Sequence, residues 1–383
     1  MMKRRVAILG STGSIGVQTL DVIGQHPQLF ETELLTANNN WELLAAQAKR
    51  YNPNSVVICN REHYASLSKA LENEPIKVFA GIDSAVELLK GAEIDIVVAA
   101  MVGFSGLRPT IEAIKSKKAV ALANKETLVA AGAIVTRLAR ENNVPILPVD
   151  SEHSAIFQSL QGEKAEVEKL ILTASGGPFR NADKESILNA TKEQALNHPN
   201  WSMGEKVTID SATMMNKGLE MIEACWLFQM PAERIEIVVH PQSIIHSMVQ
   251  FSDGSVKAQM GVPDMRIPIQ YALSYPYRIA LDAERVDFPK IGHFTFYAPD
   301  REKFPALDLA FHAHKRGGNM ACIMNGANEA AVNAFLQGKI RFGQIPKIIE
   351  SCMKSCSYIK EPSPDDIFST HEEAMRRAQD YFN

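Results

Sequence analysis

Two short acidic stretches, far apart in the chain, hold the residues best suited to chemistry. Asp150 and Glu152 follow the apolar run Val144–Val149, and Glu220 lies about seventy residues later. The apolar run predicts a short buried strand, so both carboxylates of the pair can point into one pocket where that strand ends. Oxygen ligands of this kind suit a hard divalent cation such as Mg²⁺ or Mn²⁺. The alternative is that these are surface carboxylates that cap the next helix.

A glycine-rich segment near the N-terminus predicts a dinucleotide site. Residues 10–16 read Gly-Ser-Thr-Gly-Ser-Ile-Gly and follow the apolar strand Val6–Leu9 directly. Glycines let the backbone turn tightly there, and the amides at the start of the next helix can meet a pyrophosphate. The hydroxyl groups of Thr12 and Ser14 add hydrogen-bond donors. The segment therefore favours a hydride-transfer enzyme.

The end of the second expected strand bears on which dinucleotide is bound. An NAD site normally has an acidic residue there to hold the ribose 2′-hydroxyl, but this chain has Asn38, Asn39 and Asn40. Without a carboxylate to repel a 2′-phosphate, NADP is favoured, although no Arg or Lys is present to attract one. Asparagine is also a common turn residue, so a purely structural role is the alternative.

Further along, polar groups collect where later strands are expected to end. Asn124, Lys125 and Glu126 follow one strand, and the carboxyl ends of strands are where ligands bind in open α/β sheets. Lys125 could meet the substrate or cofactor, or could be a solvated lysine at a helix start. Hydroxyl, amide and ammonium groups suited to a phosphate monoester without an arginine fork are supplied by Ser175, Ser211, Asn216 and Lys217.

The order of the strands and helices that must position these residues predicts an α/β protein with three parts. Residues 1–149 alternate strands and helices, as in a Rossmann-like parallel sheet, and residues 150–285 read as a catalytic α+β domain. Poor periodicity at 189–206 is typical of a lid. A connector at 286–305 leads to a helical bundle at 306–383. The expected strands are Val6–Leu9, Glu33–Ala37, Ser55–Ile58, Ile94–Ala99, Ala119–Leu122, Val144–Val149, Lys169–Ala174, Ile235–Val239 and Ile245–Phe251.

Composition limits the classes of partner. With 46% hydrophobic and 22% charged residues and a net charge of −4, the chain offers no general attraction to nucleic acid or anionic membranes. No apolar run approaches the roughly 18 residues needed to span a bilayer. The five scattered cysteines form no disulfide framework, and the chain enters its first strand without a signal peptide's apolar core. We therefore expect a cytoplasmic protein.

Seven motifs together resemble the 1-deoxy-D-xylulose 5-phosphate reductoisomerase family, the NADPH- and divalent-metal-dependent enzymes of the non-mevalonate isoprenoid pathway. With the order of the domains, the resemblance covers nearly the whole chain. The matching stretches are GSTGSIG (10–16), ALANKE (121–126), PVDSEHSAIFQ (148–158), TASGGPF (173–179), HPNWSMG (198–204), DSATMMNKGLE (210–220) and HPQSIIHSMVQF (240–251).

The resemblance implies a homodimer with a Rossmann domain, a central catalytic domain and a C-terminal four-helix bundle. It also implies that a small phosphorylated sugar rearranges to a branched aldehyde, which NADPH reduces to 2-C-methyl-D-erythritol 4-phosphate. Trp201 is expected to cover the carbon skeleton.

Site residues also follow from the resemblance. The metal ligands are Asp150, Glu152 and Glu220. Catalysis is assigned to Lys125, Asp150, Glu152, His198 and Glu220. The residues expected to bind the substrate are Lys125, Ser151, Glu152, Ser175, His198, Trp201, Ser211, Asn216, Lys217 and Glu220. The residues expected to bind the cofactor are Gly10, Thr12, Gly13, Ser14, Ile15, Asn38, Asn39, Asn40, Asn124, Glu126 and Gly204.

Two other functions compete with this one. The first is a different NADP-dependent dehydrogenase that catalyses no rearrangement and often manages without a metal. The second is a nucleotide-sensing or scaffold protein with a decayed site, which would be expected to lack some of the catalytic residues, yet all are present. One departure from the family pattern is Asn39, which stands where some members carry a basic residue near the 2′-phosphate. It puts the strength of the preference for NADPH over NADH in doubt.

Overall fold

The structure is a computed structural model that describes residues 3–91 and 93–382. Contacts between residues divide the chain into two compact units, which are described separately. Unit 1 contains the segments Met1–Thr127, Val135–Ser154 and Asp264–Glu284. Unit 2 contains Leu128–Ile134, Ala155–Pro263 and Arg285–Asn383.

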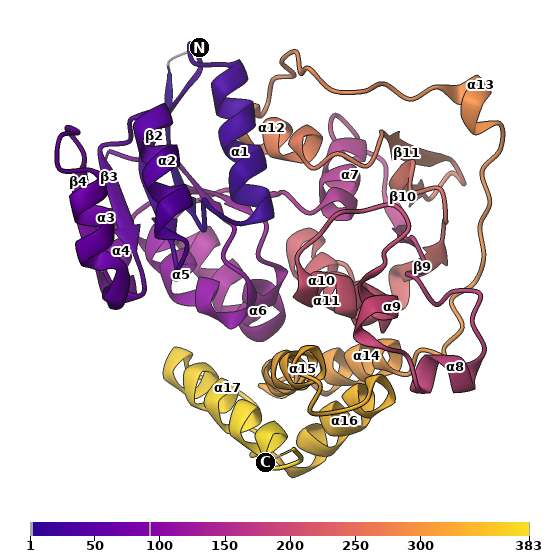
Figure 1. Ribbon diagram of the computed structural model, residues 1–383. Helices are drawn as coiled ribbons and strands as arrows, with labels where there is room; N and C mark the ends of the chain where they lie inside the picture. The colour runs from indigo at the N-terminus through magenta and orange to yellow at the C-terminus, as the bar shows by residue number, and fades with distance from the viewer. Residues whose placement is uncertain (1–2, 92, 383) are drawn as a thin grey trace. The chain divides into compact units, whose positions relative to one another are not determined.

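Unit 1 is built on a seven-stranded parallel sheet with the order β4-β3-β2-β1-β5-β6-β7 (Figure 1). The inner strands are buried along most of their length, as a parallel sheet covered on both faces requires. This confirms the predicted Rossmann-like sheet. Its strands are β1 (Arg4–Leu9), β2 (Phe30–Ala37), β3 (Ser55–Ile58), β4 (Lys77–Ala80), β5 (Ile96–Ala99), β6 (Ala119–Leu122) and β7 (Ile146–Pro148).

Helices cover both faces of this sheet. Right-handed crossovers from one parallel strand to the next place the helices before β4 on one face and those after it on the other. The first set is α1 (Ser14–Gln25), α2 (Trp41–Tyr51) and α3 (Tyr64–Ala70), and the second includes α4 (Ile82–Gly91) and α5 (Leu107–Lys115). The strand order reverses beside β1, which is where open α/β sheets bind ligands.

The turn between β1 and α1 depends on glycine at two positions. Gly10 has a φ of +89°, and a Cβ there would lie 2.9 Å from the carbonyl oxygen of Ala100. A Cβ on Gly16 would lie 2.3 Å from the carbonyl oxygen of Gly10. Any side chain would therefore push the loop away from the sheet and open the turn that starts α1.

Residues 264–284 belong to unit 1, although the sequence placed them with the second predicted domain, 150–285. They contain α12 (Arg266–Ser274), which packs on α1. Arg266 pairs with Asp21 of α1 at 2.9 Å, and the guanidinium of Arg4 donates to the carbonyl of Leu273 at 2.7 Å. These partners lie some 250 residues apart, so no local pattern could have indicated the packing.

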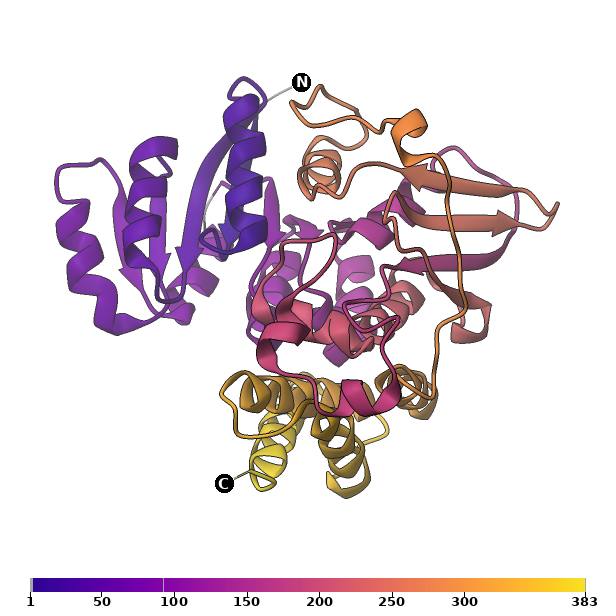
Figure 2. The same ribbon diagram turned by 45° about the vertical axis from the view of Figure 1, so that its right-hand side comes forward.

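Unit 2 combines a four-stranded sheet with the C-terminal helices (Figure 2). The strand order is β11-β10-β8-β9, in which β8 pairs antiparallel with β10 and parallel with β9. The elements that position functional groups are β8 (Val167–Ala174), β9 (Ile235–Val239), β10 (Ile245–Phe251), β11 (Val256–Met260), α8 (Lys184–Leu188), α9 (Lys192–Leu196), α10 (Glu205–Ala212) and α11 (Met215–Phe228).

The predicted C-terminal helical bundle is confirmed, and it shares its core with this sheet. One cluster of buried residues runs from Leu170 on β8 through Leu219 on α11 to Ile323 and Ile349 in the bundle. Gly218 allows close packing, because a Cβ there would lie 2.5 Å from the Cβ of Ala310. The bundle helices are α14 (Ala306–Arg316), α15 (Met320–Leu336), α16 (Ile345–Ser355) and α17 (Pro364–Gln379).

No helix within the described residues has both the length and the apolar character needed to cross a membrane.

A partly buried histidine should make the stability of the bundle depend on pH. Burial lowers the pKa of His371 on α17 to about 4. An unfolded chain protonates histidine near pH 6.5, so between about pH 4 and 6.5 the unfolded state binds more protons. The free energy of unfolding should therefore be fully retained above that window and fall by about 1–2 kcal/mol as the pH drops through it, after allowance for solvent screening.

The check is thermal unfolding of the wild type and of His371→Gln at about pH 5 and pH 7.5. The wild type should lose more stability on acidification than the variant, which cannot titrate at this position. Equal losses in the two proteins would show that His371 does not account for the dependence.

Candidate active site

The predicted acid pair lies where β7 ends and α7 (Ser151–Ser159) begins. Asp150 precedes the helix, and Glu152 occupies its first turn, where it accepts a hydrogen bond of 2.5 Å from the hydroxyl of Ser151. Lys125, the first residue of α6 (Lys125–Glu141), places its Nζ 2.5 Å from Oδ2 of Asp150. His153 Nδ1 lies 3.8 Å from the same oxygen. Unit 1 thus brings the two predicted carboxylates and Lys125 to the ends of neighbouring strands.

The Lys125–Asp150 pair is largely removed from water. The two side chains are 10% and 13% exposed, and His153 is fully buried. Charges in such surroundings interact more strongly than they would on the surface, and they require partners. The cluster can therefore hold a cation firmly or stabilise negative charge that develops on a bound molecule.

Asn124 ties together the loops that follow β5 and β6. Its Oδ1 accepts from the backbone N–H of Thr127 at 3.0 Å and so caps α6. Its Nδ2 donates to the carbonyls of Met101 at 2.5 Å and Gly103 at 2.8 Å, and lies 3.2 Å from Glu126. Because these partners occupy the side chain, a cofactor contact from Asn124 would come from its backbone.

The three asparagines after β2 are exposed. Asn40 caps α2 by accepting from the backbone N–H of Leu43 at 3.1 Å, and Asn39 accepts from the side chain of Asn60 at 3.0 Å. Asn40 therefore has a structural role, as the N-cap of α2 rather than as the turn residue that was the alternative from the sequence. The exposed side-chain amide groups of these asparagines, at the carboxyl end of β2, can still contact solvent or a ligand.

In unit 2, the loop after β8 lies against the end of α10. Gly176 and Gly177 have φ values of +83° and +65°, and a Cβ on Gly177 would lie 2.7 Å from the carbonyl oxygen of Ser211. Ser175, at the start of this loop, and Ser211 are thereby brought onto neighbouring segments. Met214 then turns the chain with a φ of +60° into α11, which carries Asn216 and Lys217 in its first turn. The four predicted phosphate residues thus come from adjacent segments.

Glu220 is held by two residues that precede it on α11. The Nδ2 of Asn216 donates to Oε1 of Glu220 at 2.5 Å, and Lys217 pairs with Oε2. Glu220 is 1% exposed and Lys217 is 4% exposed. A buried carboxylate requires compensation of this kind. The spacings of three and four residues place all three side chains on one side of the helix.

The hydrogen bonds of His198 define its tautomer. Its Nδ1 accepts from the backbone N–H groups of Asn200 at 3.2 Å and Trp201 at 3.0 Å. The proton of the neutral ring therefore lies on Nε2, which donates to the hydroxyl of Ser175 at 2.9 Å. Burial, and after it the charge of Arg180, lowers the pKa of His198, so the ring stays neutral at pH 7.

We expect His198→Ala to raise KM for the substrate about 10-fold with a smaller effect on kcat, because it removes one positioned hydrogen bond and loosens the loop. Two variants separate these causes in steady-state kinetics. His198→Asn can replace the acceptor at Nδ1, and His198→Gln can replace the donor at Nε2. An unchanged KM in His198→Ala would rule out a role in substrate binding.

Asn200 is a functional candidate that the sequence analysis overlooked, although it lies within the HPNWSMG motif. Its Nδ2 donates to the carbonyl of Pro241 at 2.6 Å and to the hydroxyl of Ser243 at 2.9 Å, which anchors the loop. The ring of Trp201 lies 6.0 Å from that of His246. Within the predicted lid, 189–206, α9 forms a short helix, and its capping box of Thr191 and Gln194 was the overlooked sequence signal.

The fold and these groups define a class of protein. A glycine-rich turn at the switch point of a doubly wound sheet is the hallmark of Rossmann-type dinucleotide-binding proteins. A largely buried acidic cluster with a lysine and a separate hydroxyl-rich loop add the groups that an enzyme acting on a small anionic substrate needs.

The chain belongs to the 1-deoxy-D-xylulose 5-phosphate reductoisomerase family. Models of the family match residues 6–132, and its C-terminal domain models match 146–228 and 260–377. The 1-deoxy-D-xylulose 5-phosphate reductoisomerase of Bacteroides thetaiotaomicron is 56% identical over 377 residues, which span 98% of this chain and 97% of that protein.

Solved structures of enzymes with this name are similar to the chain over nearly its whole length. The Zymomonas mobilis enzyme in complex with NADPH is 46% identical, with a TM-score of 0.93 over 100% of this chain and 99% of that one. A DOX-P reductoisomerase in complex with NADPH, fosmidomycin and magnesium is 38% identical, with a TM-score of 0.95 over 99% and 98% of the two chains.

Proposed function

We propose that this chain converts 1-deoxy-D-xylulose 5-phosphate to 2-C-methyl-D-erythritol 4-phosphate, with NADPH as reductant and Mg²⁺ or Mn²⁺ as metal. The observation that carries the proposal is the buried cluster of Asp150, Glu152 and Lys125. It occurs in a chain of this family, whose solved relatives bind NADPH and magnesium. Oxidoreductase and isomerase chemistry are then combined in one protein.

Three carboxylates are proposed to hold the metal: Asp150, Glu152 and Glu220. An all-oxygen donor set suits a hard cation. Glu152 and Glu220 each have a neighbour that orients them, Ser151 in the first case and Asn216 in the second. Such outer partners usually accompany metal ligands. The ion, when bound, supplies positive charge against the negative charge that develops on the substrate's oxygens.

The phosphate is proposed to bind Ser175, Ser211, Asn216 and Lys217, with His198 donating beside Ser175. The support is that Gly177 packs on the backbone of Ser211 and that Asn216 and Lys217 begin the next helix. Trp201 then covers the carbon skeleton and keeps water from it, while the 189–206 segment acts as the lid.

The cofactor is proposed to run from the glycine turn to the strand ends of unit 1. The residues assigned are Gly10, Thr12, Gly13, Ser14, Ile15, Asn38, Asn39, Asn40, Asn124 and Glu126, with Gly204 from unit 2. The turn at Gly10 and the helix start at Gly13, which has no side-chain cap, support the pyrophosphate position. Asn39 supplies no positive charge for the 2′-phosphate, so discrimination against NADH should be modest.

We also propose three functional domains, 1–149 for the cofactor, 150–285 for metal and substrate, and 306–383 as the bundle, in a cytoplasmic homodimer. All five cysteines are free, as a reducing compartment favours. Phe288, Phe296 and Tyr297 are exposed aromatic residues in the connector, 286–305, and such groups favour association. Sedimentation equilibrium would test the dimer.

Product analysis tests the function against its main rival. We expect the ¹³C NMR spectrum of a reaction with 1-deoxy-D-xylulose 5-phosphate, NADPH and Mg²⁺ to show the branched skeleton of 2-C-methyl-D-erythritol 4-phosphate. A dehydrogenase without the rearrangement would give an unbranched polyol phosphate. A protein that only senses nucleotides would bind NADPH and form neither product.

A further inference from the structure

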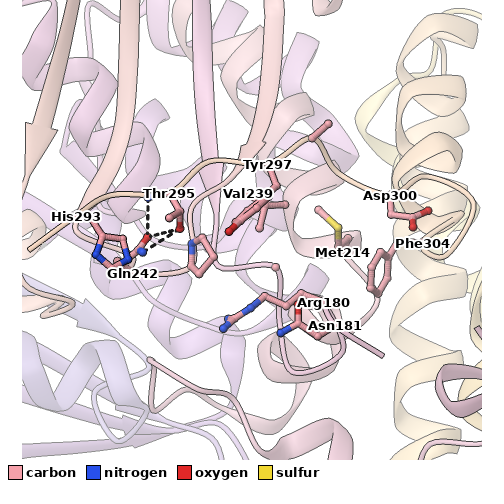
Figure 3. Close-up of a pocket in the computed structure, with 13 residues that line it drawn as sticks. Arg180, Asn181, Met214, Val239, Gln242, His293, Thr295, Tyr297, Asp300 and Phe304 are labelled. Atoms are coloured by element: carbon pink, nitrogen blue, oxygen red, sulfur yellow. Dashed lines mark hydrogen bonds between the residues drawn. The ribbon is translucent and has the colours of Figure 1, made fainter. Parts of the chain in front are cut away.

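A cavity of about 430 Å³ lies within unit 2 beside the loop that carries Ser175 (Figure 3). Gly176 of that loop and Arg180 shortly after it line one side. Thr295 of the connector lines another, where its hydroxyl accepts from the Nε2 of Gln242 at 2.9 Å. The cavity thus adjoins the loop that carries Ser175.

Arg180 runs directly across this loop. Its Cβ and Cδ lie 3.0 and 3.3 Å from where a Cβ of Gly176 would be, so the aliphatic part of the side chain packs on the glycine. The side chain is partly buried, yet across residues 3–91 and 93–382 its guanidinium makes no ion pair or hydrogen bond. A guanidinium has five donors suited to phosphate, and withdrawing it from water without an anion costs free energy.

The positive charge of Arg180 acts on His198, which lies beside Ser175. After burial, it is the second cause that lowers the pKa of His198. His198 in turn donates to Ser175, the first of the proposed phosphate residues. The other groups of the loop are neutral hydroxyls and amides, and the charge of Lys217 is balanced by Glu220. Of Arg180 and Lys217, only Arg180 has no carboxylate within ion-pair distance in the part of the chain that the structure describes.

We propose that Arg180 is a specificity-determining residue for the phosphate group, providing the positive charge that the Ser175–Gly177 loop otherwise lacks. The inference rests on the proposed function, because it takes a phosphorylated sugar as the substrate. Long-range attraction of this kind strengthens binding of a doubly charged anion and weakens as salt is added.

Two substitutions separate the charge of Arg180 from its packing. Arg180→Met keeps an unbranched apolar stem and removes the charge, whereas Arg180→Lys keeps the charge. We expect Arg180→Met to raise both KM for the substrate and the inhibition constant of inorganic phosphate about 10-fold at low ionic strength, with the difference shrinking in salt. Arg180→Lys should stay within about threefold of wild type, and NADPH affinity should not change in either variant.

Arg301→Met is the matched control, since it removes an exposed guanidinium of the same unit that pairs with Asp308 at 2.8 Å. It should leave both constants unchanged. Wild-type constants in Arg180→Met would overturn the proposal, and equal impairment of the Met and Lys variants would assign Arg180 to loop packing instead. Failure of the proposed function would show separately, as absent turnover in the wild type, and calorimetric titration with inorganic phosphate would still compare the variants.

Discussion

Glu220→Gln should reduce kcat at least about 100-fold while leaving the affinity for NADPH nearly unchanged. The substitution keeps the size of the side chain and removes one negative charge from the proposed metal ligands. Both oxygens of Glu220 are engaged in the structure, Oε1 with Asn216 and Oε2 with Lys217. The amide can still accept from Asn216, but it no longer balances the charge of Lys217 or attracts a divalent ion.

The experiment must distinguish lost catalysis from lost stability, because Lys217 is buried and would lose its counter-ion. Thermal unfolding and NADPH binding by fluorescence should accompany the kinetics. Glu236→Gln, which breaks a surface pair with Lys169 in the same unit, is the control and should have wild-type activity. Near-normal turnover of Glu220→Gln at saturating Mg²⁺ would refute the assignment of Glu220 as a ligand.

Lys125→Met is expected to have the second largest effect, again a loss of about 100-fold in kcat. Its Nζ lies 2.5 Å from Asp150 in a largely buried site, so its charge acts beside the carboxylates that are proposed to bind the metal. Unlike Glu220→Gln, this variant removes a cation that competes with metal for Asp150. The affinity for Mn²⁺ should therefore be retained or increased.

Electron paramagnetic resonance of added Mn²⁺ measures that affinity alongside the kinetics. Lys115→Met, at an exposed position on α5, controls for the loss of a lysine and should change neither quantity. Weaker Mn²⁺ binding in Lys125→Met would mean that Lys125 organises the carboxylates rather than acting on the substrate.

The buried parts of the fold could be predicted closely from the sequence. Ser55–Ile58, Ala119–Leu122, Ile235–Val239 and Ile245–Phe251 are confirmed at both ends. The strands that were missed, β4 and β11, each lie at the edge of a sheet and contain no buried residue, so their apolar signal is weak.

The types of residue in the site could be predicted from the sequence, but the residues that they contact could not. The acids, the lysines and the glycine turn stand in recognisable local motifs. The anchoring of Asn200 to Pro241 and Ser243 depends on contacts across some forty residues. The sequence contained a usable signal for Arg180, because it is a basic residue just after a loop of hydroxyl and glycine residues. Its position beside Gly176 is visible only in the fold.

We propose above all that a divalent ion held by carboxylates supports NADPH-dependent turnover of 1-deoxy-D-xylulose 5-phosphate. The most direct test follows NADPH oxidation by its near-ultraviolet absorbance, first with the metal-stripped protein and then during titration with Mg²⁺ or Mn²⁺. We expect no oxidation without metal, saturable recovery when metal is added, and no recovery in Glu220→Gln. Full activity in the presence of a strong chelator would contradict it.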